Sequence, residues 1–170
     1  DDAFQFLSRA SSQGNIADAN PDLALCLAYR GNVADAHKLL GSFLEHVVEL
    51  RHPRLYVDTA IAGGLVWSMA GDWSAGLEHL EVARQIAGKY GDDVRRARLA
   101  PHLVRFYTWK QNYDAGEQIL QEGERLSARL GLPDVAARTE TERGHWLAEQ
   151  GRFTEAVEAF SRPLGFFASS

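Results

Sequence analysis

The sequence predicts an all-α protein, a right-handed solenoid of stacked antiparallel helix pairs. Two observations lead to this fold class. One six-residue phrase returns four times at a constant spacing of 40 residues, starting at Gly31, Gly71, Gln111 and Gly151. No stretch shows the sustained alternation of apolar and polar residues that indicates a β-strand. A fixed period in this range is typical of proteins built from stacked structural repeats.

Each copy of the phrase has the features of a turn between two helices. A turn residue, mostly glycine, suits the left-handed conformation that ends a helix. A following Asn or Asp can cap the next helix. A large apolar residue then anchors that helix, and a small residue three positions later admits a neighbouring helix. The four copies read GNVADA, GDWSAG, QNYDAG and GRFTEA.

Apolar residues at fixed offsets extend this register in both directions. Small or compact residues stand seven positions before each turn, at Ala24, Gly64, Val104 and Gly144. Large apolar residues stand nine positions after it, at Leu40, Leu80, Leu120 and Phe160. Large apolar residues also stand four positions before each turn, at Leu27, Trp67, Tyr107 and Leu147. Each of these lies three residues after the small residue, on the same face of the first helix, so we expect the small residues to pack closely against a partner helix.

The predicted helices follow from this register, taken in chain order. After a turn at 13–15 they cover 20–30, 33–50, 56–70, 73–90, 94–110, 113–130, 135–150 and 153–161. Residues 91–93 (Gly-Asp-Asp) end one helix and cap the next, and Asp134 is the expected N-cap of the seventh. Pro163 and Gly165 are expected to end the last helix early.

The repeats resemble the tetratricopeptide (TPR) pattern W-x2-L-G-x2-Y, then A-x3-F, then P. The first part is matched by Leu23-Ala24-x2-Leu27, Gly64-x2-Trp67, Leu103-Val104-x2-Tyr107 and Gly144-x2-Leu147. The second part is matched by Ala36-x3-Leu40, Gly76-x3-Leu80, Gly116-x3-Leu120 and Ala156-x3-Phe160. The first Trp is replaced throughout, and the closing Pro is missing from the first three copies.

A period of 40 residues is about six longer than the usual 34, and we expect the extra residues mainly in a longer second helix. This variant resembles the repeats of large ATP-dependent LuxR-type regulators of the maltose-activator (MalT) kind. It is also similar to the Leu-Gly-Asn-repeat adaptors, whose helix endings resemble Arg129-Leu130-Gly131 and residues 89–92 (Lys-Tyr-Gly-Asp).

The register predicts a single solenoid over 1–170. Residues 1–16, with Phe4 and Leu7, form either the end of a preceding repeat or a cap. The repeats cover 17–56, 57–96, 97–136 and a truncated 137–170. The chain therefore reads as a piece of a longer protein. We expect self-association through its exposed ends, where an apolar tail contains Leu164, Phe166 and Phe167.

Composition narrows the class of protein. The chain is 45% hydrophobic and 24% charged, as is usual for a soluble globular protein. A net charge of −5 argues against a nucleic-acid or anionic-membrane binder, which is usually basic. No apolar run approaches the roughly 20 residues that span a bilayer. The one cysteine, Cys26, cannot form an intrachain disulfide and is predicted to be a buried spectator.

The motifs of catalysis and metal binding are missing from the sequence. It has no HExxH, no G-x-S-x-G and no phosphate-binding glycine-rich loop. His46 and His52 are six residues apart and do not share a helix face. We therefore predict no enzyme activity, no metal and no cofactor.

The TPR resemblance implies a recognition surface, because in such arrays the first helix of each repeat lines the concave face. Carried onto this chain, the groove positions are Tyr29, Leu65, Met69, Arg98, Arg105, Trp109, Arg138 and His145. The first two repeats supply apolar contacts and the last two supply arginines, which suit bidentate capture of a carboxylate or phosphate. A peptide with an acidic group fits this combination. The alternative is a solvated charged face with no ligand.

These observations favour a protein- or ligand-binding module, the sensor or interaction domain of a larger bacterial transcriptional regulator. The expected partner is a protein or peptide with an acidic group, or a small inducer. The expected location is cytoplasmic, with no membrane and no direct nucleic-acid contact by this segment. The alternative is a scaffold or adaptor that binds proteins and has no small ligand.

Overall fold

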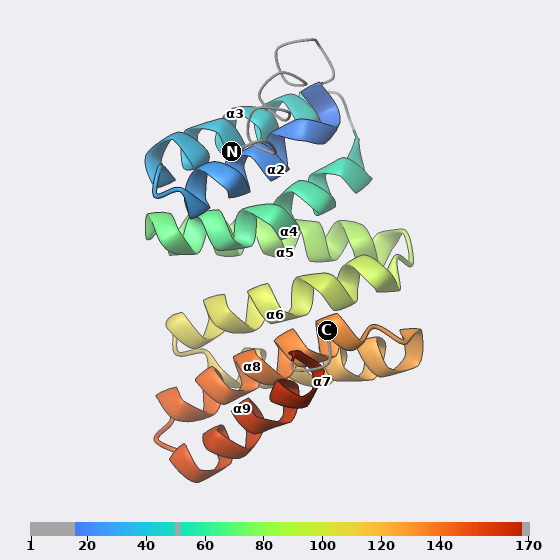
Figure 1. The fold of residues 1–170 in the computed structure, drawn as a ribbon. Coiled ribbons are helices and arrows are strands. Elements are labelled where there is room, and N and C mark those ends of the chain that lie inside the picture. Colours follow the sequence, from blue (N-terminus) through green and yellow to red (C-terminus); the bar gives the residue numbers. More distant parts are fainter. Residues whose placement is uncertain (1–15, 50–51, 168–170) are drawn as a thin grey trace. The chain divides into compact units, whose positions relative to one another are not determined.

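Eight helices make up the described part of the chain, and no strand occurs in it (Figure 1). The computed structural model describes residues 16–49 and 52–167, with side chains over 21–47 and 52–163. In chain order the helices are α2 (Ile16–Tyr29), α3 (Val33–Glu49), α4 (Pro53–Ala70), α5 (Trp73–Lys89), α6 (Asp93–Trp109), α7 (Tyr113–Leu130), α8 (Pro133–Glu149) and α9 (Phe153–Phe167). The all-α prediction is confirmed.

The helix boundaries repeat with the period of the sequence. The second helices α3, α5, α7 and α9 begin 40 residues apart, at Val33, Trp73, Tyr113 and Phe153. The first helices α4, α6 and α8 also begin 40 residues apart, at Pro53, Asp93 and Pro133. One sequence register therefore sets every helix start from α3 to α9.

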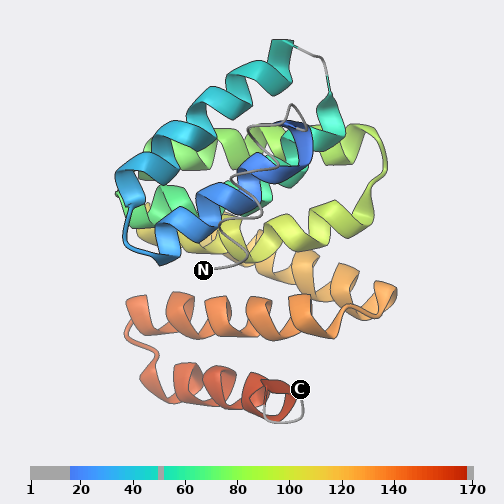
Figure 2. The same ribbon diagram turned by 45° about the horizontal axis from the view of Figure 1, so that its top comes forward.

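The chain divides into two compact units, residues 1–86 and 87–170, and the division falls within α5. In the first unit α2 packs on α3 and α4, and α3 packs on α4. In the second unit α6 packs on α7 and α8, α7 packs on α8, and α8 packs on α9. Figure 2 shows α8 and α9, in orange and red, side by side as an antiparallel pair.

The predicted turns have the predicted backbone conformation. The φ angles are 85° at Gly31, 74° at Gly71 and 74° at Gly151, and the third turn keeps this conformation at Gln111, with φ of 57°. At the second turn the amides of Gly71 and Asp72 donate to carbonyls of the last turn of α4. The left-handed residue thus closes one helix and directs the chain into the next.

Asp72, Asp92 and Asn112 cap the helices that follow them, and one predicted cap is absent. Asp92 accepts a hydrogen bond from the Arg95 amide at 3.1 Å, which confirms the cap predicted at 91–93. Asn112 accepts from the Ala115 amide at 3.3 Å. The predicted cap at Asp134 is wrong, because α8 begins at Pro133, a residue suited to the first helical position. Leu132, the residue that precedes Pro133, packs against a buried cluster formed by Ala97, Leu126 and Val135.

Three expectations about helix extent are wrong. Helix α9 continues through Pro163 to Phe167, because the proline ring is buried against the fold and this packing offsets the lost hydrogen bond. Helix α2 begins at Ile16 and not near residue 20. The first and second helices have similar lengths, 18 and 17 residues in α4 and α5, so the extra residues do not lie mainly in the second helix.

The small residues that stand seven positions before each turn are buried in the core, as the repeat register predicts. Ala24 and Val104 are fully buried, and Gly64 and Gly144 are buried as well. A Cβ added at Gly144 would lie 2.5 Å from a ring carbon of Phe160, so only glycine fits this helix crossing. Cys26 is partly exposed, contrary to the buried position predicted for it.

The predictions for the chain ends lie outside the described residues. Phe4 and Leu7 precede the first described residue, and the side chains of Leu164, Phe166 and Phe167 follow the last described side chain.

Candidate recognition surfaces

Five of the predicted site residues lie on the first helices of the second unit. Arg98, Arg105 and Trp109 follow one another on α6 at intervals of seven and four residues, which places them on one helix face. Arg138 and His145 occupy the equivalent positions on α8, 40 residues after Arg98 and Arg105. We call these five residues the basic face.

The basic face contains an ion pair that the sequence did not indicate. The Arg105 guanidinium donates two hydrogen bonds to the carboxylate of Glu142, one of them from Nε to Oε2 at 3.3 Å. The Glu142 side chain is only 6% exposed and that of Arg105 is 36% exposed. The buried carboxylate therefore neutralises Arg105 and links α6 to α8.

His102 lies on α6 between Arg98 and Arg105 and adds no charge to the basic face at neutral pH. Burial, together with the positive charges of Arg105 and Arg138, lowers the pKa of His102 to about 4. His102 is therefore a neutral polar group near pH 7.

Arg98 and Arg138 carry the positive charge that the basic face presents to solvent. Both side chains are exposed, and within the described side chains neither forms an ion pair with a carboxylate. Trp109 adds an exposed indole, 48% accessible, at the end of α6. His145 is exposed too, and its ring lies edge-on to Phe160 with the centroids 5.0 Å apart. The basic face thus combines two unneutralised guanidinium groups with aromatic surface.

The other three predicted residues belong to the first unit. Tyr29, the last residue of α2, is 74% exposed. Leu65 and Met69 lie four residues apart on α4; Leu65 is partly exposed and Met69 is 43% exposed. The eight predicted residues therefore fall into two groups, apolar in the first unit and mainly basic in the second.

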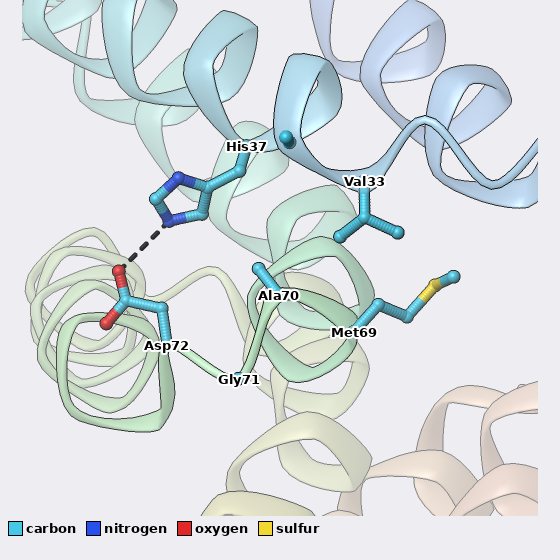
Figure 3. Close-up of a pocket in the computed structure, with 7 residues that line it drawn as sticks. Val33, His37, Met69, Ala70, Gly71 and Asp72 are labelled. Atoms are coloured by element: carbon cyan, nitrogen blue, oxygen red, sulfur yellow. Dashed lines mark hydrogen bonds and ion pairs between the residues drawn. The ribbon is translucent and has the colours of Figure 1, made fainter.

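A surface pocket of about 640 Å³ opens in the first unit beside Met69 (Figure 3). It lies between the first turn of α3 and the last turn of α4, and its lining residues are Val33, Ala34, His37, Met69, Ala70, Gly71 and Asp72. At one side His37 Nε2 is 3.0 Å from Asp72 Oδ2. Sequence reasoning selected Met69 but missed His37 and Asp72, because their contact joins two repeats and only Asp72 belongs to the turn phrase.

The described residues contain no group of three or more His, Cys, Asp or Glu side chains that could hold a metal ion. Among the described helices, none is both long enough and apolar enough to cross a membrane.

Comparisons with known proteins agree on the fold. No known protein-family profile matches the chain, and no curated protein is similar to it in sequence. A solved structure from Podosopora anserina, a provisionally assigned kinesin light chain with nearly identical TPR-like repeats, superposes with a TM-score of 0.69 at 19% identity. That match covers 96% of this chain and 77% of the other.

BtubC (BKLC) from P. vanneervenii superposes with a TM-score of 0.61 at 15% identity, over 98% of this chain and 87% of the other. Both likenesses are likenesses of fold. Together with the 40-residue period of the helices, they show that this chain has a TPR-like helical-repeat fold.

Proposed function

We propose that this chain is a protein-interaction module, not an enzyme, and that its basic face binds an acidic segment of a partner polypeptide. The observation that carries this proposal is the state of its three arginines. Arg105 is neutralised inside the fold by Glu142, whereas Arg98 and Arg138 are exposed and unneutralised among the described side chains.

The chemistry of the basic face favours carboxylates in an extended peptide. A guanidinium group offers several N–H donors in a planar fork that matches a carboxylate. Arg98 and Arg138 stand at equivalent positions of adjacent first helices, so they present two such forks one repeat apart. Trp109 supplies apolar contact area beside them. A peptide with two acidic residues and an apolar one would satisfy all three groups.

A selection experiment tests this function without knowledge of the natural partner. The whole chain is used to select from a displayed library of random 12-residue peptides, and the consensus peptide is then titrated by calorimetry. We expect Asp and Glu to be enriched. We expect Arg98→Gln combined with Arg138→Gln to weaken the consensus peptide about tenfold, roughly the effect of two exposed charge-assisted contacts, and added salt to weaken it further.

The control is Arg125→Gln on α7, which removes one charge, half the change made by the double variant, from another exposed arginine outside the basic face. It should leave the affinity of the consensus peptide unchanged. Selection of neutral or basic peptides, or equal affinity for the double variant and the control, would refute binding of an acidic segment at the basic face.

We further propose that the module belongs to a larger bacterial transcriptional regulator and acts there as its cytoplasmic sensor or interaction domain. The support is the sequence resemblance to LuxR-type regulators together with the 40-residue helix period. The full-length reading frame tests this context. A nucleotide-binding segment on one side and a helix-turn-helix segment on the other are expected, and a reading frame that lacks both would favour a plain scaffold.

A further inference from the structure

The pocket of the first unit has an apolar wall and one acidic group. Val33 and Ala34 from α3 and Met69 and Ala70 from α4 form the apolar wall. Asp72 is the one acid in the lining, which contains neither Lys nor Arg. The pocket therefore favours a cation that also has an apolar stem.

In the second unit, the positions equivalent to the pocket residues lie 80 residues later in the sequence. There Arg152 stands in place of Asp72, and Glu117 stands in place of His37. The Arg152 guanidinium lies 5.7 Å from the centroid of the Trp146 ring and donates to Glu155. A guanidinium of the chain itself thus occupies this corner of the second unit.

The indole beneath that guanidinium also belongs to the chain. Trp146 donates its Nε1–H to the Tyr113 carbonyl at 3.2 Å, and its ring lies against Gly116. In the first unit the equivalent of Trp146 is Val66, and the equivalent of Gly116 is Ala36. The first unit therefore has neither the indole nor the guanidinium, and it has the opposite charge, at Asp72, in the position of Arg152.

We propose that this pocket binds an arginine side chain of a partner polypeptide. The aliphatic stem would lie along Val33 and Met69, and the guanidinium would face the Asp72 carboxylate. That carboxylate retains acceptor capacity, because two oxygens offer about four lone-pair sites. Of these, Oδ2 contacts His37 and Oδ1 accepts a long hydrogen bond from the Ala75 amide at 3.4 Å.

This proposal does not depend on the acidic-peptide proposal. It concerns the other unit and a ligand of opposite charge, so either proposal can fail while the other stands.

Titration of the whole chain by nuclear magnetic resonance tests the pocket. The probe is N-acetyl-L-arginine methylamide, and its neutral isostere, the corresponding citrulline amide, serves as the ligand control. We expect saturable amide shifts confined to residues 33–37 and 69–72 with the arginine probe and none with citrulline. Equal shifts with both probes, or shifts scattered over both units, would overturn the proposal.

Two variants identify the carboxylate. Asp72→Asn keeps a residue that caps α5 well, so the fold should persist, and it should weaken the arginine probe about fivefold. The matched control, Asp35→Asn, removes an exposed carboxylate in the first turn of α3 outside the lining and should leave binding unchanged. Equal affinity for both variants would overturn the role of Asp72.

A third variant tests whether the arginine probe binds in this pocket, even if Asp72→Asn disturbs the fold. His37→Arg places a guanidinium of the chain itself beside Asp72, whose carboxylate the His37 ring nitrogen contacts at 3.0 Å. We expect it to abolish the shifts caused by the arginine probe. Undiminished binding to His37→Arg would overturn the proposal.

Discussion

Gly144 on α8 and Phe160 on α9 touch so closely that an added Cβ on the glycine would lie 2.5 Å from the phenylalanine Cε1. The three earlier repeats have Leu40, Leu80 and Leu120 at the position of Phe160, and all three leucines are almost fully buried. In the last repeat the larger ring lies directly against a glycine, which has no side chain.

Replacing Gly144 by alanine should therefore destabilise the protein. The ring must move or the helices must separate, which typically costs about 1–3 kcal/mol, although alanine favours a helix by about 1 kcal/mol over glycine. The control is Gly41→Ala within α3, where nothing lies within 4 Å of the added Cβ and a higher melting temperature is expected. Calorimetry measures both, and equal shifts in the two variants would contradict the close contact.

Gln111 is a second position where backbone conformation predicts a stability change. Its φ of 57° is left-handed, whereas the equivalent turns have glycine. A side chain in this region costs about 1–2 kcal/mol, partly offset by the entropy of a more flexible unfolded chain. Gln111→Gly should therefore raise stability by about 0.5–1 kcal/mol, measured by urea unfolding.

The reverse substitution provides its control. Gly71→Ala should lower stability by about 1 kcal/mol, and because nothing lies within 4 Å of the added Cβ, only the backbone conformation can cause the loss. No change in either variant would show that the left-handed turn carries no strain.

Replacing only Arg105 of the Arg105–Glu142 pair should lower the free energy of unfolding more than replacing both residues. Arg105→Leu leaves a buried carboxylate without its partner, at a cost of about 1–3 kcal/mol. Adding Glu142→Leu removes the unpaired charge and should recover most of that loss. Urea unfolding of the two single variants and the double variant measures the coupling. Additive losses would mean that the pair is not a buried contact.

Stability should fall in mild acid because of His102. Its pKa in the folded state, about 4, lies below the ordinary 6.5, so the folded state binds this proton more weakly than the unfolded state. The contribution of neutral His102 to the free energy of unfolding is fully present above pH 6.5 and is lost as the pH falls toward 4. Between pH 7 and pH 5 we expect a loss of about 2 kcal/mol.

Thermal unfolding of wild type and His102→Gln across pH 7 to 5 checks this dependence. The variant should show a shallower decline, since glutamine does not titrate and the remaining change comes from other groups. Parallel curves for the two proteins would show that His102 does not bind its proton more weakly in the folded state.

Much of the fold could be predicted from local chemistry. A left-handed glycine followed by a capping residue specifies a turn within a few residues, so the 40-residue recurrence of that phrase located the starts of α3, α5, α7 and α9. The same local rules failed at Pro163. There a proline that would stop an isolated helix is buried, and tertiary packing keeps the helix intact.

The recognition surfaces could be predicted only in part. The repeat register placed Arg98, Arg105 and Arg138 on the same face of the first helices, but it could not show which of them pairs with a carboxylate. Glu142 lies 37 residues after Arg105, and no local rule predicts that these two side chains pair. The same holds for the pocket, where the contact of His37 with Asp72 joins residues 35 apart.

The sequence by itself determined the class of fold, the positions of the turns and the helix faces on which the small residues lie, because these depend on residues within a few positions of one another. Only the tertiary structure decided which arginines keep a free charge and where a pocket remains open. Those properties depend on side chains that come from different helices, and both burial and charge neutralisation arise only when the helices pack.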